Sequence, residues 1–255
     1  MISRRAVLAL APMVAVMLTA GVGVQLDAAE AAGSCAASDG HALRTSPRPV
    51  TARTVALTFD DGPNPATTPQ ILRILARNRV HATFFVVGDR ARTYPDLLRQ
   101  IDAGGHRIGN HTWSHPMPSR GGAFSTLTAA EVAAQIDRTQ RVVVDATGVR
   151  PCFFRAPGGS DGAATLRRAA SARRLTVVNW TLDPQDWAAP DTPSASFQRR
   201  IVARSTGSWS RHPVVLMHDG PDHDYRGNTV ASLQRVIDWY KVRGYTFTDP
   251  LGRRF

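Results

Sequence analysis

The sequence predicts an α/β fold in which seven strand–helix units form a barrel around a parallel sheet. From about residue 53 onward, short apolar runs alternate with segments of helical periodicity, and this alternation is typical of parallel sheets. The runs are continuously apolar, as expected for strands covered on both faces. Seven units in about 200 residues favour a seven-unit, incomplete barrel over an eight-unit barrel, which typically needs about 250 residues.

The individual elements follow from these two patterns. The predicted strands are, in order, Val55–Phe59, Ala82–Val87, Arg107–Gly109, Phe153–Arg155, Thr176–Asn179, Val214–Met217 and Tyr245–Phe247. The predicted helices are Thr68–Asn78, Tyr94–Ala103, Ala129–Thr147, Gly162–Arg173, Ser196–Arg204 and Val230–Arg243. In a parallel barrel the loops that follow the strands emerge on one face. Polar residues in these loops are therefore expected to meet there.

The N-terminus has the pattern of an export signal. Arg4 and Arg5 precede the uncharged, mostly apolar run Ala6–Ala20, and small residues follow it. The alternative is a retained membrane anchor, but the run is short for a spanning helix. We expect residues 1–31 to be a cleaved signal peptide and the protein to be secreted or associated with the cell wall.

The remaining chain is expected to be one domain behind a linker. Residues 32–52 are small, polar and proline-containing, which predicts a linker, and residues 53–255 carry the regular pattern. After residue 26 no stretch is long and apolar enough to span a bilayer, so no integral span is expected after cleavage. Nothing in the sequence demands more than a monomer.

The charge and the cysteines suggest where the protein works. The formal net charge is +11, and of the 31 basic residues only Lys241 is a lysine. The arginines are scattered, which disfavours a nucleic-acid binder; the charge fits either an anionic surface such as a cell wall or a generic solubilising role. In an exported chain Cys35 and Cys152 predict one disulfide. Two free thiols, or a lipidated Cys35, are the alternatives.

Chemically active side chains follow five of the predicted strands. In chain order they are Asp60-Asp61, His111 with His115, Arg155, Asp183 with Asp186, and His218-Asp219. If residues 110–116 form a helical turn, both histidines face the same way and can reach one ion. A lone His-x-x-x-His pair is more often a surface or helix-cap feature, but two carboxylates that directly follow an apolar strand favour a metal site. Two imidazoles and one carboxylate leave coordination positions open, as in catalytic sites.

These residues also match a known family. Thr58-Phe59-Asp60-Asp61-Gly62-Pro63, His111-Thr112-Trp113-Ser114-His115, Arg155-Ala156-Pro157-Gly158-Gly159, Asp183-Pro184-Gln185-Asp186-Trp187 and Leu216-Met217-His218-Asp219 stand in this order. They resemble the five motifs of the NodB-homology polysaccharide deacetylases, carbohydrate esterase family 4. The resemblance covers about residues 53–250 and implies a distorted (β/α)7 barrel that removes acetyl groups from a polysaccharide.

The resemblance also implies a role for each residue. Asp61, His111 and His115 correspond to the ligands of a divalent metal, usually zinc and sometimes cobalt. Asp60 corresponds to the catalytic base, with Arg155 to orient it. His218 corresponds to the general acid, with Asp186 to orient it.

Three further positions correspond to substrate-binding residues. Leu216 and Trp187 would line the pocket for the acetyl methyl group, and a backbone N–H near Gly158 would stabilise the oxyanion. Many family members carry an aromatic residue where this chain has Gly158, which implies a different wall of the cleft. The expected substrate is an N-acetylated polysaccharide such as chitin, chito-oligosaccharide or peptidoglycan. An acetylxylan esterase and a non-catalytic cell-wall-binding protein are the alternatives.

Overall fold

The computed structural model describes residues 53–117, 127–159, 164–207, 210–220 and 226–255. Seven strands form one parallel sheet, as predicted: β1 (Thr54–Asp60), β2 (Thr83–Val86), β3 (Arg107–Asn110), β4 (Phe153–Phe154), β5 (Thr176–Val177), β6 (Val214–His218) and β7 (Thr246–Phe247). Their order is β5-β4-β3-β2-β1-β6, and β7 pairs with the start of β1. The α/β prediction is therefore confirmed.

The sheet forms a distorted barrel, in which the gap between β5 and β6 is bridged by single residues and not by a strand. Beyond β5, Thr181 donates its N–H to Val214 O at 2.9 Å, and Leu216 N–H donates to Leu182 O at 2.9 Å. Leu182 thus forms a single parallel bridge to Val215 of β6. The seven-unit barrel is closed at this point by two residues of extended chain rather than by a full strand.

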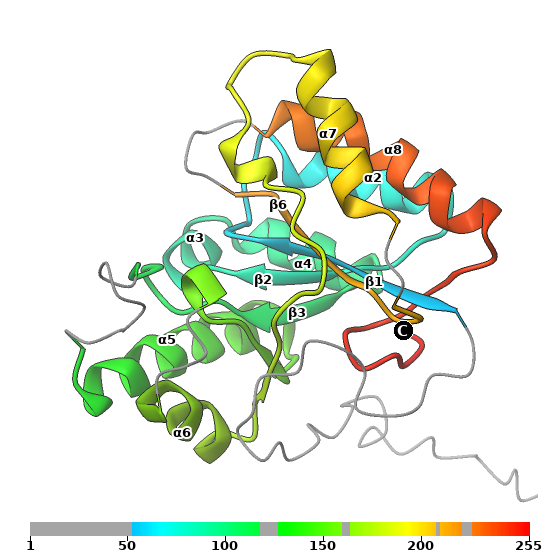
Figure 1. Ribbon diagram of the computed structural model, residues 1–255. Coiled ribbons are helices and arrows are strands. Elements are labelled where there is room, and N and C mark those ends of the chain that lie inside the picture. The colour runs from blue at the N-terminus through cyan, green and yellow to red at the C-terminus, as the bar shows by residue number, and fades with distance from the viewer. Residues whose placement is uncertain (1–52, 118–126, 160–163, 208–209, 221–225) are drawn as a thin grey trace, which may run out of the picture.

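In the described ranges seven α-helices cover the sheet: α2 (Thr68–Asn78), α3 (Gly88–Thr93), α4 (Pro95–Ala103), α5 (Ala129–Thr147), α6 (Ala164–Ala172), α7 (Ala195–Ser205) and α8 (Gly227–Val242). Two 3-10 turns, η1 (Pro157–Gly159) and η2 (Asp186–Ala188), lie in loops. Helices α2, α7 and α8 lie on one side of the strands, and α5 and α6 lie on the other (Figure 1). Helix α3 was not predicted, because its sequence GDRART has no apolar periodicity.

The core lies between these helices and the strands. All seven residues of β1 are buried, and Phe59 stacks on Phe84 of β2 with ring centroids 5.1 Å apart. Ile71 of α2 and Val236 of α8 pack into the same apolar cluster. Burial of one such large apolar side chain stabilises the fold by roughly 1.5–3 kcal/mol. The central strands are therefore anchored in the core, and so are the residues at their carboxyl ends.

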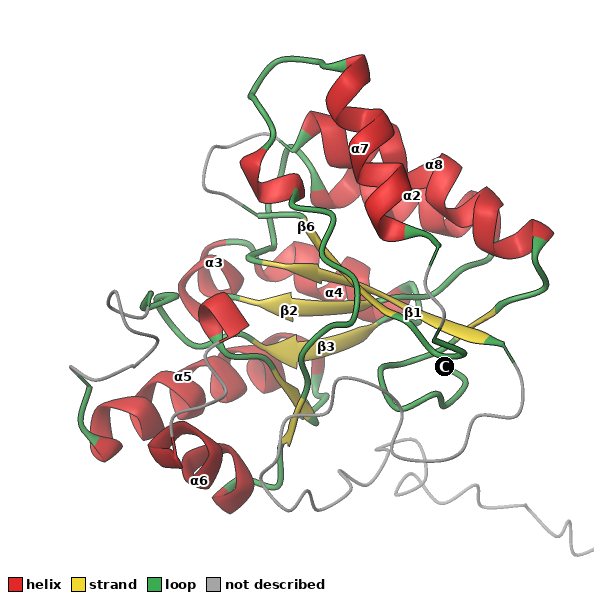
Figure 2. Cartoon of the chain, viewed as in Figure 1, coloured by secondary structure: helices red, strands yellow, loops and turns green. Residues whose placement is uncertain are grey.

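All strand ends that matter for function point the same way. The arrowheads of β1, β2 and β3 meet at one end of the sheet (Figure 2), and Asp60 at the end of β1 stands in register with His218 at the end of β6. Two predictions fall outside the described residues: the signal peptide and linker of residues 1–52, and Cys35 with its expected bridge to Cys152. Within the described ranges, no helix is long and apolar enough to cross a membrane.

Candidate metal and catalytic site

The three predicted metal ligands converge at the carboxyl ends of β1 and β3. The Nε2 atoms of His111 and His115 lie 3.3 and 3.2 Å from Asp61 Oδ1. Within the described part of the chain, this is the one group of three metal-ligating side chains whose ligand atoms lie close together, all within 4.8 Å. The structure thus brings together Asp61, His111 and His115 as a possible metal site.

The geometry of this group fits a divalent ion better than a set of hydrogen bonds. Asp61 Oδ1 is buried and has no hydrogen-bond partner among the described residues, and an unsatisfied buried carboxylate oxygen is costly. A tetrahedral ion with bonds of about 2.0–2.2 Å places its ligand atoms about 3.3–3.6 Å apart, close to the two separations observed from Asp61 Oδ1. His111 Nδ1 lies 2.8 Å from Arg155 O, so its N–H can donate there and leave Nε2 free for a metal.

The local electrostatics also favour a cation at this point. Burial by itself lowers the pKa of His111, but the carboxylates of Asp60 and Asp61 raise it overall. Burial by itself raises the pKa of Asp61, yet the neighbouring imidazoles of His111, His218 and His115 bring it well below the usual range. Asp61 is therefore held in the ionised form that a metal ligand requires.

The prediction of a helical turn between the two histidines is wrong. Residues 111–117 form a loop without helix, in which Thr112 and His115 have positive φ angles of 69° and 51°. The imidazoles meet because the loop doubles back, with ring centroids 4.9 Å apart. The four-residue spacing therefore does not act through helical periodicity here.

The predicted base and its partner form a buried ion pair beside this group. Asp60 Oδ1 accepts a hydrogen bond from Arg155 Nη1 at 2.7 Å, and both side chains are almost fully buried. The same Nη1 donates to Thr58 Oγ1 at 2.8 Å. Asp60 Oδ2 lies 3.8 Å from His111 Nε2, so the second oxygen of Asp60 faces the metal group.

Arg155 is fixed on all sides. Its Nε and Nη2 donate to the carbonyls of Val178 and Asn179, each at 3.2 Å. The guanidinium carbon lies 4.1 Å from the ring centroid of Phe85 and 5.6 Å from that of Trp180. These four contacts, together with the hydrogen bonds to Asp60 and Thr58, prevent the guanidinium from rotating away and place its positive charge beside the Asp60 carboxylate.

The predicted acid and its partner form a second buried pair. His218 Nδ1 lies 2.7 Å from Asp186 Oδ1, and the backbone N–H of His218 donates to Asp186 Oδ2 at 2.9 Å. Thr229 Oγ1 also donates to Asp186 Oδ2, at 2.8 Å. Burial lowers the pKa of His218, but the Asp186 carboxylate, with smaller contributions from Asp61 and Asp60, raises it to about 9. The imidazole is therefore protonated at neutral pH, and its Nε2–H is free to donate.

The predicted substrate-binding residues lie at the rim or beneath it. Gly158 is exposed in η1 with φ of 61°, and among the described residues none accepts a hydrogen bond from its N–H. Trp187, in η2 beside Asp186, is 46% exposed, whereas Leu216 of β6 is buried. The close packing of Gly159 on the indole of Trp180, where a Cβ would stand 2.6 Å from the ring, sets the shape of this wall.

Two further residues hold the site: Asp219, which the sequence named without giving it a role, and Arg226, which it missed. Asp219 accepts a hydrogen bond from Thr68 Oγ1 at 2.5 Å, and burial raises the pKa of Asp219 to about 7. A Cβ at Gly62 would stand 2.3 Å from this carboxylate, which explains the glycine after the two aspartates. Arg226, which donates to Gly220 O at 2.9 Å and Trp187 O at 3.2 Å, joins the loops that carry His218 and Asp186.

These residues differ in how clearly the sequence pointed to them. Asp219 directly follows His218, so its place in the motif pointed to it. Thr229 and Arg226 stand outside the motifs, and no local pattern marks them.

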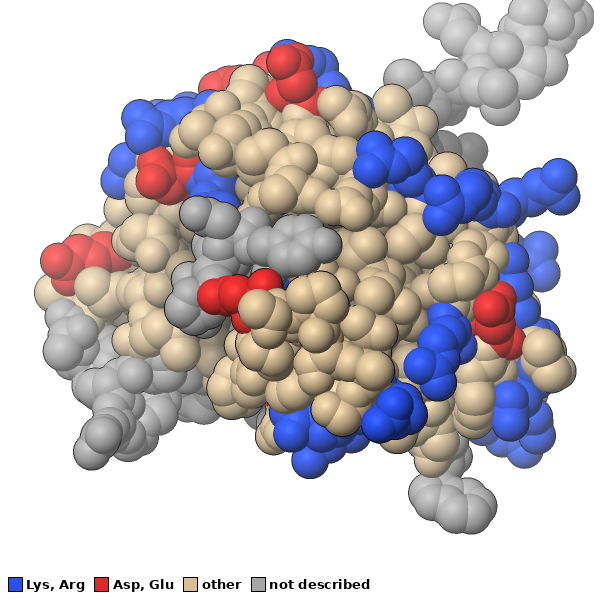
Figure 3. All heavy atoms as spheres, turned by 90° about the horizontal axis from the view of Figure 1, so that it is seen from above, with Lys and Arg blue, Asp and Glu red and all other residues tan. Residues whose placement is uncertain are grey.

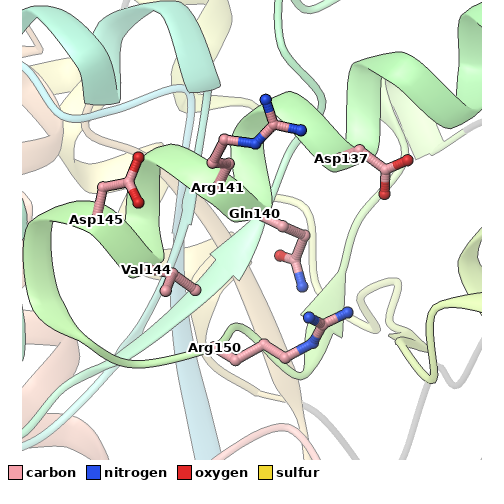
Figure 4. Close-up of a pocket in the computed structure, with 6 residues that line it drawn as sticks. All are labelled: Asp137, Gln140, Arg141, Val144, Asp145 and Arg150. Carbon is pink, nitrogen blue, oxygen red and sulfur yellow. The ribbon is translucent and has the colours of Figure 1, made fainter.

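A separate hollow of about 290 Å³ lies along α5 and the segment that follows it. It is lined by Asp137, Gln140, Arg141, Val144, Asp145 and Arg150 (Figure 4). None of the predicted site residues lines it. The cluster at the strand ends therefore remains the candidate active site.

The chain is similar to known enzymes along most of its length. The family model described as polysaccharide deacetylase matches residues 48–178. The chain is 38% identical to the chitooligosaccharide deacetylase of Sinorhizobium fredii over 80% of this chain and 93% of that protein. It is 34% identical to the peptidoglycan-N-acetylglucosamine deacetylase of Bacillus cereus over 76% of this chain and 84% of that protein.

A solved structure shows the same fold. The family 4 carbohydrate esterase from Streptomyces lividans, in complex with acetate, superimposes with a TM-score of 0.65 at 32% identity, over 79% of this chain and 96% of that one. Fold, sequence and the five motifs in order agree. The chain therefore belongs to the polysaccharide deacetylase family, carbohydrate esterase family 4, and is a hydrolase of that class.

Proposed function

We propose that this protein is exported and hydrolyses the N-acetyl groups of an amino-sugar polymer, such as chito-oligosaccharide or peptidoglycan. In this proposal Asp61, His111 and His115 bind zinc. The observation that carries the proposal is Asp61 Oδ1, which lies between two imidazole nitrogens and has no hydrogen-bond partner among the described residues. The Asp60–Arg155 pair, for a base, and the His218–Asp186 pair, for an acid, lie beside it. The names of the two relatives support an amide substrate. The signal pattern of residues 1–31 supports export.

The two buried pairs have opposite tasks. Asp60 accepts a hydrogen bond from the Arg155 guanidinium, which orients its carboxylate to accept the proton of a water molecule that attacks the acetyl carbonyl. His218 is kept protonated by Asp186, so it can donate a proton to the departing nitrogen. An amine leaves poorly as an anion, and amide cleavage therefore depends on this donor.

The remaining residues stabilise charge and position. The exposed N–H of Gly158 can donate to the oxyanion that forms at the carbonyl oxygen. A divalent ion at Asp61, His111 and His115 supplies Lewis-acid polarisation of that carbonyl when bound. Two imidazole nitrogens and one carboxylate oxygen are a donor set that suits zinc, and cobalt is the alternative that a metal-reconstitution test separates from it.

Acetate release tests the proposal. Protein recovered from the culture medium should have the mass of the chain without residues 1–31 and should release acetate from chito-oligosaccharide or peptidoglycan. A chelator should abolish release, and added Zn²⁺ should restore it. His111→Ala should lose at least about 100-fold in kcat/KM, because removal of one ligand disables the metal site.

A histidine outside the site provides the control for this experiment. His81→Ala removes an exposed histidine outside the site and should keep full activity. Release that survives both the chelator and His111→Ala would contradict metal dependence. Turnover confined to acetylxylan would replace the amide substrate with an ester, and wall binding without any acetate release would favour the non-catalytic alternative.

A further inference from the structure

The loop that carries both histidine ligands has an unfavourable backbone. Thr112 has φ of 69° and His115 has φ of 51°. Non-glycine residues rarely adopt this left-handed region, and β-branched threonine least of all. Such conformations persist only where surrounding contacts over-determine them. The contacts that hold this loop therefore decide whether the metal ligands meet.

One side of the loop is held by its own strand and by α3. Asn110 Oδ1 accepts a hydrogen bond from Thr112 N–H at 2.9 Å. Two N–H groups at the start of α3 donate to carbonyl oxygens of the loop. Gly88 N–H donates to Thr112 O at 2.9 Å, and Asp89 N–H donates to Trp113 O at 3.0 Å. These bonds fix the first half of the loop.

The second half of the loop is contacted by side chains of α5, above all by Gln135. Gln135 Oε1 accepts hydrogen bonds from the N–H groups of Trp113 and Ser114, at 2.8 and 2.9 Å. Its Nε2 donates to Ser114 Oγ at 3.0 Å. Arg138, one turn further along α5, lies 3.9 Å from the ring centroid of Trp113. One carboxamide thus satisfies two consecutive backbone donors immediately before His115.

We propose that Gln135 is a positioning residue for the metal ligand His115. By taking the N–H groups of Trp113 and Ser114, it holds the turn that brings His115 Nε2 within 3.2 Å of Asp61 Oδ1. The inference rests on the proposed metal site. It is specific to His115, because His111 is fixed independently through its own N–H to Val86 O at 3.0 Å and its Nδ1 to Arg155 O at 2.8 Å.

Zinc affinity of the purified full chain tests the role, measured by competition with a chromophoric chelator. Gln135→Met keeps the length of the side chain but removes the acceptor, and it should weaken Zn²⁺ binding by about 10–100-fold, as for other residues that orient metal ligands. Gln135→Glu still offers an oxygen to the same two N–H groups and should bind within a few-fold of the parent. Gln234→Leu on α8, which loses bonds to Asn78 and Asp238 far from the loop, should bind as the parent does.

Hydrogen exchange of the metal-free protein gives a second readout. In Gln135→Met the amides of Trp113 and Ser114 should exchange faster, whereas the amide of His111 should not change. If the methionine variant does not fold, Gln135→Asn, whose shorter side chain cannot reach the loop, replaces it in both measurements.

The proposal is overturned if a folded variant without the acceptor binds Zn²⁺ as tightly as the parent, or if all loop amides keep their exchange rates. Neither readout needs turnover. A protein that binds Zn²⁺ in this way but releases no acetate would sink the deacetylase proposal and leave the role of Gln135 intact.

Discussion

At the scale of single residues, two buried ion pairs flank the candidate metal site. Asp60 accepts a hydrogen bond from Arg155, whose pKa is lowered by burial although the charge of Asp60 opposes that shift. His218 lies against Asp186, and although burial alone would raise the pKa of Asp186, His218 and Thr229 lower it overall. The Asp186 carboxylate in turn holds His218 in the protonated form that its proposed task requires.

The pH dependence of the proposed acid follows from this pairing. Because the pKa of His218 is raised to about 9, the donor form persists below that pH and is lost above it, so kcat/KM should fall on the alkaline side. Asp186→Asn removes the charge and leaves the burial, which lowers the pKa of an imidazole. The alkaline limb of the pH–kcat/KM profile should therefore move to lower pH in this variant.

The profile of Asp145→Asn serves as the control, since Asp145 is an exposed residue of α5. An alkaline limb that stays in place in Asp186→Asn would show that another group limits the rate there.

At the scale of elements, α5 is the helix that supports the metal loop, and its own start is well defined. Thr128 Oγ1 accepts from Glu131 N–H at 3.2 Å, and Glu131 Oε2 accepts from Thr128 N–H at 2.7 Å. This reciprocal capping box satisfies two N–H groups at the start of the helix. At the other end Gly148, with φ of 74°, stops the helix.

Removal of the cap should cost stability without touching the site. Thr128→Ala should lower the free energy of unfolding by about 1 kcal/mol, which for a domain of this size lowers Tm by roughly 2–4 °C. Differential scanning calorimetry of the metal-free protein measures this. Glu131→Gln keeps a side-chain acceptor and should lose less, and an unchanged Tm in Thr128→Ala would contradict the role of the cap.

Helix α3 shows why some elements escape sequence patterns. Its six residues carry no apolar stripe, yet its first two N–H groups donate to the metal loop. A helix this short is stable only through tertiary contacts. Its place in the chain, directly after β2, was the sole local hint.

At the scale of the whole molecule, the net charge of +11 is spread rather than concentrated. Seen from above, the lysines and arginines lie around the edge of the face and do not form one continuous patch (Figure 3). The excess of basic over acidic residues gives the chain a general positive charge. We propose that it gives a long-range attraction to an anionic cell wall.

Salt should weaken that attraction, because it shortens the Debye length from about 14 Å at 0.05 M to about 4 Å at 0.5 M. The fraction of protein that sediments with purified anionic cell walls should fall steeply over this range. Uncharged chitin particles, bound through the active site alone, should show little change. Wall binding that is indifferent to salt would leave the charge as a solubilising feature.

The sequence alone determined the alternation of strands and helices and the residues at the strand ends. The bounds of α2 and α5 match the predicted Thr68–Asn78 and Ala129–Thr147, because helix periodicity and caps are local properties. Asp60, Asp61, Arg155, Asp186 and His218 could be proposed from the sequence because parallel connectivity places every strand end on one face.

Only the tertiary structure decided how those side chains meet. The helical turn predicted for residues 110–116 is replaced by a strained loop, since Gln135, Gly88 and Asp89 supply hydrogen bonds that no local pattern encodes. The pKa of His218 likewise depends on burial and on Asp186, 32 residues away in the chain. Local interactions choose helix or strand, but the geometry of a metal site and the charge of its neighbours are set by contacts between segments that the sequence keeps far apart.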